Sequence, residues 1–182
     1  MTTQHVMPIR QSFPRWCRSL QERTDWVLLD TESFVLPSQR SEAIAIAVVD
    51  AQGQILFERM FQPCAVDPDS EREQDLDDLL IFAQLWSDLN DVLLGKTIIS
   101  YGAAYNSQLL MRTAALRHVS MPGYTWHCAM VAYAEYKARA GQPRGTYCWP
   151  RLAHICQSQP QRGTLALADA MATLNLIRAG AL

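Results

Sequence analysis

The sequence lacks the long apolar runs and the paired cysteines that mark membrane proteins and disulfide-stabilised proteins. No uninterrupted apolar stretch approaches the roughly 20 residues of a membrane-spanning helix, and the N-terminal segment has no apolar core of a signal peptide. Cysteine is scarce: there are five, an odd number, with no Cys-x-x-Cys spacing, which argues against a disulfide framework or a zinc pattern. We therefore expect a soluble, cytoplasmic protein without membrane contact.

The chain as a whole also lacks a strong charge of one sign, because its formal net charge is −2. A near-neutral charge gives no global signal for nucleic-acid binding. The distribution along the chain is uneven, however. Residues 66–91 hold nine acidic side chains and one Arg, whereas residues 92–168 hold eight Lys or Arg and a single Glu. The sequence therefore predicts one acidic face and one basic face.

The chain has the length of one ordinary domain. Its 182 residues, 49% of them hydrophobic, can bury one substantial core. Phe13, Trp16 and Leu20 recur at helical spacing, which predicts a short amphipathic helix near the N-terminus. We expect an N-terminal helical extension over residues 1–24 and a single domain over residues 25–182.

Apolar patterning and turn residues predict the order of the secondary structure. Five strands are expected at residues 26–30, 42–49, 54–62, 96–101 and 125–128. Further helices are expected, the first of them capped by Ser70, at residues 70–94, 104–117, 129–139, 150–157 and 165–179. The order favours an α/β fold with a central mixed five-stranded sheet. A three-strand antiparallel meander plus parallel strands, flanked by helices, is typical of the ribonuclease H-like architecture.

Three acidic residues are the first candidates for chemistry. Asp30 and Glu32 end the first of these strands, and side chains two apart in a strand point to the same side. Their oxygens suit Mg²⁺ or Mn²⁺, although a solvated strand end is the alternative. Asp169 lies in the otherwise apolar, small-residue stretch 164–173, where its alternatives are a cap or a surface position. If all three converge, they form most of a two-metal phosphodiesterase site.

These motifs resemble those of the DnaQ-like DEDD exonucleases. The first motif is Trp-Val-Leu-Leu-Asp-Thr-Glu at residues 26–32, the second is Ile-Ile-Ser-Tyr-Gly-Ala-Ala-Tyr-Asn-Ser-Gln-Leu-Leu at 98–110, and the third is Thr-Leu-Ala-Leu-Ala-Asp-Ala at 164–170. The resemblance covers nearly the whole chain. It implies a ribonuclease H-like fold, two divalent ions and hydrolysis of nucleotides from a 3′ end. It assigns Asp30, Glu32 and Asp169 as metal ligands.

Two positions depart from the pattern of active relatives. The second motif in those relatives ends in a metal-site Asp, and here that position is Asn106, which carries no charge, so weaker binding of one ion is expected. The third motif normally has a general-base His five residues before its Asp, and here that position is Thr164. The sister subgroup uses a Tyr at the next position, which is Leu165. Loss of a general base commonly costs about 10² to 10⁴ in rate.

The resemblance also indicates where a nucleic acid would bind. Thr31 and Ser33, on either side of Glu32, are expected to contact the nucleotide. Side chains in the basic and aromatic stretch 137–151 can hold phosphates or stack on bases, at about 1 to 3 kcal/mol per base; these are Arg144, Tyr147, Trp149 and Arg151. Alternatively, the aromatics plug the core. The acidic segment 66–78 would repel a phosphate backbone near the cleft, or it forms a solvated helix start.

Three functions stay open at this point. The first is a catalytically impaired exonuclease-like protein that binds 3′ ends of single-stranded DNA or RNA. The second is a working metal-dependent 3′-5′ exonuclease with an altered site. The third is a non-catalytic module that binds a protein partner.

Overall fold

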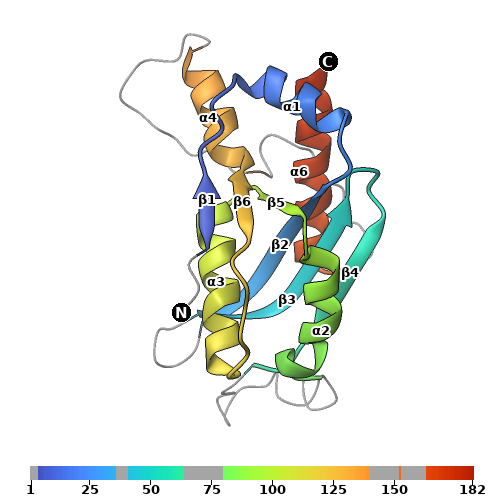
Figure 1. The fold of residues 1–182 in the computed structure, drawn as a ribbon, viewed down its shortest axis with the longest axis vertical. Coiled ribbons are helices and arrows are strands. Elements are labelled where there is room, and N and C mark those ends of the chain that lie inside the picture. Colours follow the sequence, from blue (N-terminus) through green and yellow to red (C-terminus); the bar gives the residue numbers. More distant parts are fainter. Residues whose placement is uncertain (1–3, 36–40, 64–79, 140–151, 153–162) are drawn as a thin grey trace.

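The computed structural model describes residues 4–35, 41–63, 80–139, 152 and 163–182. Its strands are β1 (His5–Met7), β2 (Trp26–Val35), β3 (Ser41–Asp50), β4 (Ile55–Met60), β5 (Thr97–Ser100) and β6 (Thr125–Cys128). Its helices are α1 (Phe13–Gln21), α2 (Phe82–Leu93), α3 (Ala103–Leu116), α4 (Ala129–Arg139) and α6 (Leu165–Ala181). Figure 1 shows their arrangement around a central sheet.

The sheet has six strands in the order β1-β6-β5-β2-β3-β4. β2, β3 and β4 form the expected antiparallel meander, and β5, β6 and β1 continue the sheet in parallel with β2. The predicted α/β class and mixed sheet are confirmed. The predicted count of five strands is one too few, because His5–Met7 pairs with β6. A three-residue strand is too short to show an alternating apolar pattern in the sequence. β1 is recognised as a strand only by its pairing with β6.

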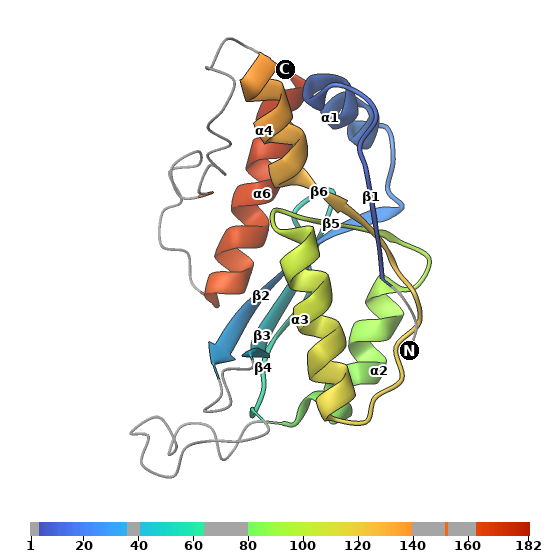
Figure 2. The same cartoon turned by 90° about the vertical axis from the view of Figure 1, so that its left-hand side faces the viewer.

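Helices cover both faces of the sheet, as Figure 2 shows. α1, α4 and α6 lie over one face, where the sheet residues Leu28, Ala47 and Ile99 share a buried cluster with residues of these helices. α2 and α3 lie over the other face, where Leu29 and Ile46 are buried among helical residues. β2 is therefore packed on both faces, which fixes the strand that carries the first acidic motif.

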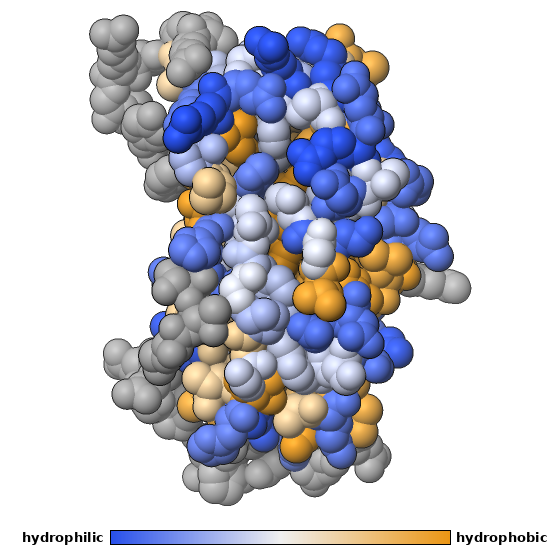
Figure 3. Space-filling view, viewed as in Figure 1, coloured by the Kyte–Doolittle hydropathy of each residue, from blue (hydrophilic) through white to orange (hydrophobic). Residues whose placement is uncertain are grey.

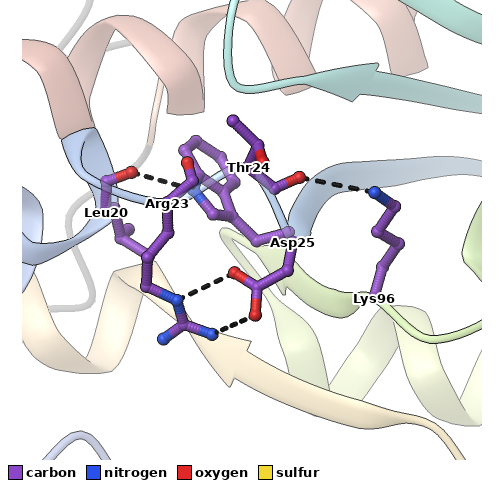
Figure 4. A network of polar contacts seen from close by, with 6 residues as sticks. Leu20, Arg23, Thr24, Asp25 and Lys96 are labelled. Atoms are coloured by element: carbon purple, nitrogen blue, oxygen red, sulfur yellow. Dashed lines mark hydrogen bonds and ion pairs between the residues drawn. The ribbon is translucent and has the colours of Figure 1, made fainter.

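Polar contacts fix the turn that leads from α1 into β2 (Figure 4). Nε and Nη2 of Arg23 each donate to the carboxylate of Asp25 at 2.8 Å. The indole Nε1 of Trp26 donates to the carbonyl oxygen of Leu20 at 3.0 Å. Exposed ion pairs contribute at most about 1 kcal/mol, so the buried Trp26 is the main anchor. It sets the start of β2, and the motif acids follow along the same strand.

The helix expected over residues 70–94 is interrupted just before Phe82. α2 starts at Phe82, and the predicted cap Ser70 lies outside the described residues. Ile81 forms an isolated parallel bridge with Gln62. The backbone N–H of Gln62 also donates to the carbonyl oxygen of Leu80 at 3.1 Å. These pairings to the segment after β4 interrupt any helix that would run through residues 80–81.

Several predicted features lie outside the described residues. They are Ser70, the acidic segment 66–78 and, except for Leu152, the helix expected at residues 150–157. Within the described ranges, no helix combines the length and apolar character needed to span a bilayer.

The edge strand β4 leaves apolar side chains exposed. Ile55, Leu56 and Met60 are all accessible to solvent. Figure 3 shows apolar atoms on this side of the molecule, where β4 lies beside α2. The charged Arg59 among them limits edge-to-edge pairing with another sheet, since charges on edge strands oppose such contacts.

Candidate functional site

The outer half of β2 carries Asp30 and Glu32 on the sheet face that α6 covers. Asp30 pairs with Ala47 of β3 and Glu32 with Ala45, and both alanines are buried. Their methyl groups leave room above the sheet for the two carboxylates. A β-bulge between Glu32 and Ser33 interrupts the regular pairing, a feature common beside functional sites.

Asn106, in the first turn of α3, contacts the carboxylate of Asp30. Its Nδ2 donates to Oδ1 of Asp30 at 2.8 Å and to the hydroxyl of Ser100, while its Oδ1 accepts from the hydroxyl of Thr31 at 2.6 Å. The residue is only 3% exposed. An ionised carboxylate accepts hydrogen bonds and donates none, so the amide must turn its N–H groups toward Asp30. The second motif therefore reaches the site with hydrogen-bond donors in place of negative charge.

Asp169, on α6, lies within electrostatic reach of the β2 carboxylates. Burial raises the pKa of Asp30 to about 7; the hydrogen bond from Asn106 opposes this rise, and the charges of Asp169 and Glu32 add to it. The pKa of Asp169 is also raised, by partial desolvation and by the charge of Glu32, although the side chain is exposed. The charges of the three motif acids therefore act on one another, and their ionised forms repel.

Two glutamates from the sheet hold the first turn of α6. Thr164 is the N-cap, and its hydroxyl accepts from the N–H of Leu167 at 3.1 Å. Oε1 of Glu58 accepts from the N–H of Thr164 at 2.8 Å and from its hydroxyl at 3.1 Å. Oε1 of Glu32 accepts from the N–H of Ala166 at 3.1 Å. The residue at the general-base position is therefore engaged as a helix cap.

The carboxylates have oxygen ligands of the kind that a divalent cation binds, but they are not placed as a ligand set. Among the residues described, no group of three or more His, Cys, Asp and Glu side chains is placed to hold a metal ion. One oxygen of Asp30 is engaged by Asn106, and one of Glu32 by the N–H of Ala166. Oxygen ligands and uncompensated charge fit a cation. Asn106 adds no charge that would help to hold a second ion.

The predicted substrate contacts divide into two groups. Outside the described residues lie Arg144, Tyr147, Trp149 and Arg151. Thr31 is buried and its hydroxyl donates to Asn106. Ser33 is exposed, and its hydroxyl accepts from the hydroxyl of Tyr105 at 2.8 Å. Contact of these residues with a nucleotide stays a prediction.

Sequence reasoning missed three side chains at this site. Tyr105 is 53% exposed, and its place directly before Asn106 in the second motif was the signal that could have found it. Ser100 is the last residue of β5 and lies within the same motif. Glu58 belongs to no motif. Strand pairing alone brings it to the site, because Ala47 of β3 pairs with Asp30 on one side and with Glu58 on the other.

One known protein is similar to this chain in sequence, and two solved structures are similar to it in fold. A relative in Escherichia phage 186, named an uncharacterized exonuclease CP81, is 28% identical over 171 residues, 85% of this chain and 87% of that protein. The RNase domain of the yeast Pop2 protein has a TM-score of 0.56 at 15% identity, covering 91% of this chain and 81% of that chain. A chain in the structure of the yeast NOT1 MIF4G domain co-crystallized with CAF1 has a TM-score of 0.53 at 16% identity, covering 96% and 92%. No protein-family model matches the chain.

The sequence and fold similarities point to the same class of protein as the motif resemblance. The solved structures, at 15% and 16% identity, bear on the fold. The phage protein is related in sequence over most of both chains. The chain is therefore related in sequence to a phage protein named an exonuclease, and it shares its α/β fold with the RNase domain of the yeast Pop2 protein.

Proposed function

We propose that this protein binds the 3′ ends of single-stranded DNA or RNA together with Mg²⁺ or Mn²⁺, and that it hydrolyses them slowly or not at all. The contact between Asn106 and Asp30 carries the proposal, because an amide N–H donates where active relatives are expected to have a metal-binding acid. The engagement of Thr164 with Glu58 supports it further. In this proposal, positions 106 and 164 correspond to the acid and the base of active relatives and have changed their chemistry.

In this proposal Asp30, Glu32 and Asp169 hold a single cation. A divalent cation, when bound, supplies the charge that activates a water and stabilises the leaving oxygen of a phosphodiester. Asn106 orients Asp30 and contributes no charge of its own. Thr164 does not accept a proton from water, because its hydroxyl lacks the basicity that a general base needs near neutral pH. A rate lower by about 10² to 10⁴ than that of a His-containing relative is the expected result.

The substrate would reach the site past Tyr105 and Ser33. The two residues are exposed and joined by a hydrogen bond at the edge of the acidic cluster. The ring of Tyr105 presents a flat apolar surface on which a terminal base can stack. We propose that basic residues of segment 137–151 add phosphate contacts, as expected from the sequence.

We also propose that the protein acts in the cytoplasm. Cys17 and Cys128 are both buried free thiols in the described part of the chain. Free thiols of this kind are typical of reducing compartments.

The proposal is tested with a double variant, Asn106→Asp/Thr164→His. It restores the acid and the base that the resemblance expects at these positions. Release of nucleotides from a 3′-labelled single strand with Mn²⁺ is measured for the wild type, the double variant and Asp30→Ala. We expect little turnover by the wild type and clear turnover by the double variant. Rapid wild-type turnover that Asp30→Ala abolishes would contradict impaired catalysis.

A second candidate is a working exonuclease with an altered site. The relationship to a phage protein named an exonuclease favours it. Under this alternative, the wild type releases nucleotides at a rate comparable to that of the double variant. The same assay therefore separates the two functions.

A further inference from the structure

Glu58 faces the candidate site although no motif includes it. It lies on β4 and pairs with Ala47 of β3, which in turn pairs with Asp30 of β2. Residues in one row across a sheet project from the same face. Glu58 and Asp30 therefore share the face that α6 covers, and only the methyl group of Ala47 lies between them in that row.

The carboxylate of Glu58 accepts two hydrogen bonds from Thr164, the residue at the start of α6. Its Oε1 accepts from the backbone N–H of Thr164 at 2.8 Å and from the hydroxyl of Thr164 at 3.1 Å. That hydroxyl gives its hydrogen to Glu58 and accepts from the N–H of Leu167 at 3.1 Å. The contacts form a chain from β4 through the cap residue into the first turn of the helix.

The residue before the cap is shaped to let Glu58 approach. Gly163 has φ of +122°, and a Cβ added there would lie 2.7 Å from Oε1 of Glu58 and 3.0 Å from Cδ2 of Leu167. A non-glycine residue would both adopt a rare backbone conformation and collide with the carboxylate. Only glycine at position 163 therefore lets the carboxylate of Glu58 approach this closely.

The anchored turn determines where the third motif acid lies. Asp169 follows Thr164 by five residues in one continuous helix, which is about 1.4 turns. We propose that Glu58 is a positioning residue of the site, which anchors the first turn of α6 and thereby keeps Asp169 within reach of a cation shared with Asp30 and Glu32. The part that concerns the cation rests on the proposed function; the anchoring does not.

Three substitutions at one position separate hydrogen bonding from charge. Glu58→Gln keeps an oxygen acceptor at the same reach and loses the charge, Glu58→Asp keeps the charge and shortens the reach, and Glu58→Ala removes both. Asp91→Ala is the matched control, because it removes an exposed acid on α2. Each protein is examined by Mn²⁺ titration and by amide hydrogen exchange without metal, after circular dichroism has established that it is folded.

We expect Glu58→Gln to match the wild type in Mn²⁺ affinity and amide exchange, and we expect Glu58→Asp and Glu58→Ala to bind Mn²⁺ more weakly and to exchange faster. In Glu58→Ala, the Mn²⁺ dissociation constant should rise and the amide exchange of Thr164, Ala166 and Leu167 should accelerate. Each change should be about tenfold, as expected for loss of one or two hydrogen bonds to a charged acceptor. Glu58→Gln should stay within about threefold of the wild type in both measurements.

Two results would overturn the inference. One is unchanged exchange at the first turn of α6 in Glu58→Ala. The other is a Gln variant as impaired as the Ala variant, since charge rather than hydrogen bonding would then be responsible. If the wild type itself binds no Mn²⁺, the proposed function fails, and hydrogen exchange alone decides whether Glu58 anchors α6.

Discussion

Nδ2 of Asn106 donates a hydrogen bond to Oδ1 of Asp30 over 2.8 Å, and the same amide is held by the hydroxyls of Thr31 and Ser100. The position at which the family resemblance implies a metal-binding acid therefore holds an amide, which donates to Asp30 and adds no charge. Both hydroxyls can donate as well as accept, so the pocket would also tolerate a carboxylate at position 106.

Asn106→Asp should strengthen cation binding. A fourth carboxylate would face Asp30, which costs stability without metal and favours Mn²⁺ when it is present. We expect the Mn²⁺ dissociation constant to fall by about tenfold or more, which corresponds to about 1.4 kcal/mol. Isothermal titration calorimetry near pH 7.5 measures the change. Asn175→Asp, an exposed position on α6, is the matched control and should have no such effect.

Stability without metal should fall as the pH rises from about 4 to about 7. The pKa of Asp30 is raised to about 7 from an ordinary value of 3.8, so the folded state binds a proton that the unfolded state has released within this window. The stabilisation is present below pH 4 and is lost as the pH rises through 7, a loss on the order of a few kcal/mol. Urea denaturation at several pH values measures it.

Asp30→Asn provides the control for that measurement. The amide keeps an oxygen that can accept from Asn106 but does not titrate. The decline of stability with pH should therefore be much smaller in this variant, with a remainder from Asp169, whose pKa is raised as well. An equal decline in both proteins would show that Asp30 does not carry the effect.

Thr164→Ala should destabilise the fold by about 1 kcal/mol. The variant loses the cap that accepts from the N–H of Leu167 and one of the two hydrogen bonds to Glu58. Thr164→Ser keeps the hydroxyl and should lose little. The midpoint of urea unfolding measures both. Equal midpoints for wild type and Thr164→Ala would mean that the cap does not contribute.

Tyr105→Ala should weaken binding of single strands. Loss of a stacking surface costs about 1 to 3 kcal/mol where a base rests on the ring, whereas Tyr105→Phe keeps the ring and loses only the contact with Ser33. Fluorescence anisotropy with a labelled oligonucleotide, in Ca²⁺ to suppress hydrolysis, measures affinity. Tyr136→Ala, an exposed tyrosine on α4, is the control. Equal losses at both positions would contradict a site at Tyr105.

The elements with strong local patterns were predictable. The strand that carries Asp30, the hairpin around Gly53 and the long helix with Asp169 all follow from apolar periodicity and turn residues. The start of α2 was not, because Ser70 offers a plausible cap, while a bridge between Gln62 and Ile81 keeps the chain extended just before Phe82. A sequence can contain more than one plausible helix start, and contacts with distant residues determine which one forms.

The sequence by itself determined the fold class and the three acids, since both depend on periodicity and on residue types at fixed spacing. Only the tertiary structure decided what the altered positions do. Asn106 clamps Asp30, and Thr164 is held by Glu58, because strands and helices distant in the chain pack at one edge of the sheet. Hydrogen-bond partners of this kind depend on register and helix placement, so neither spacing nor composition reveals them.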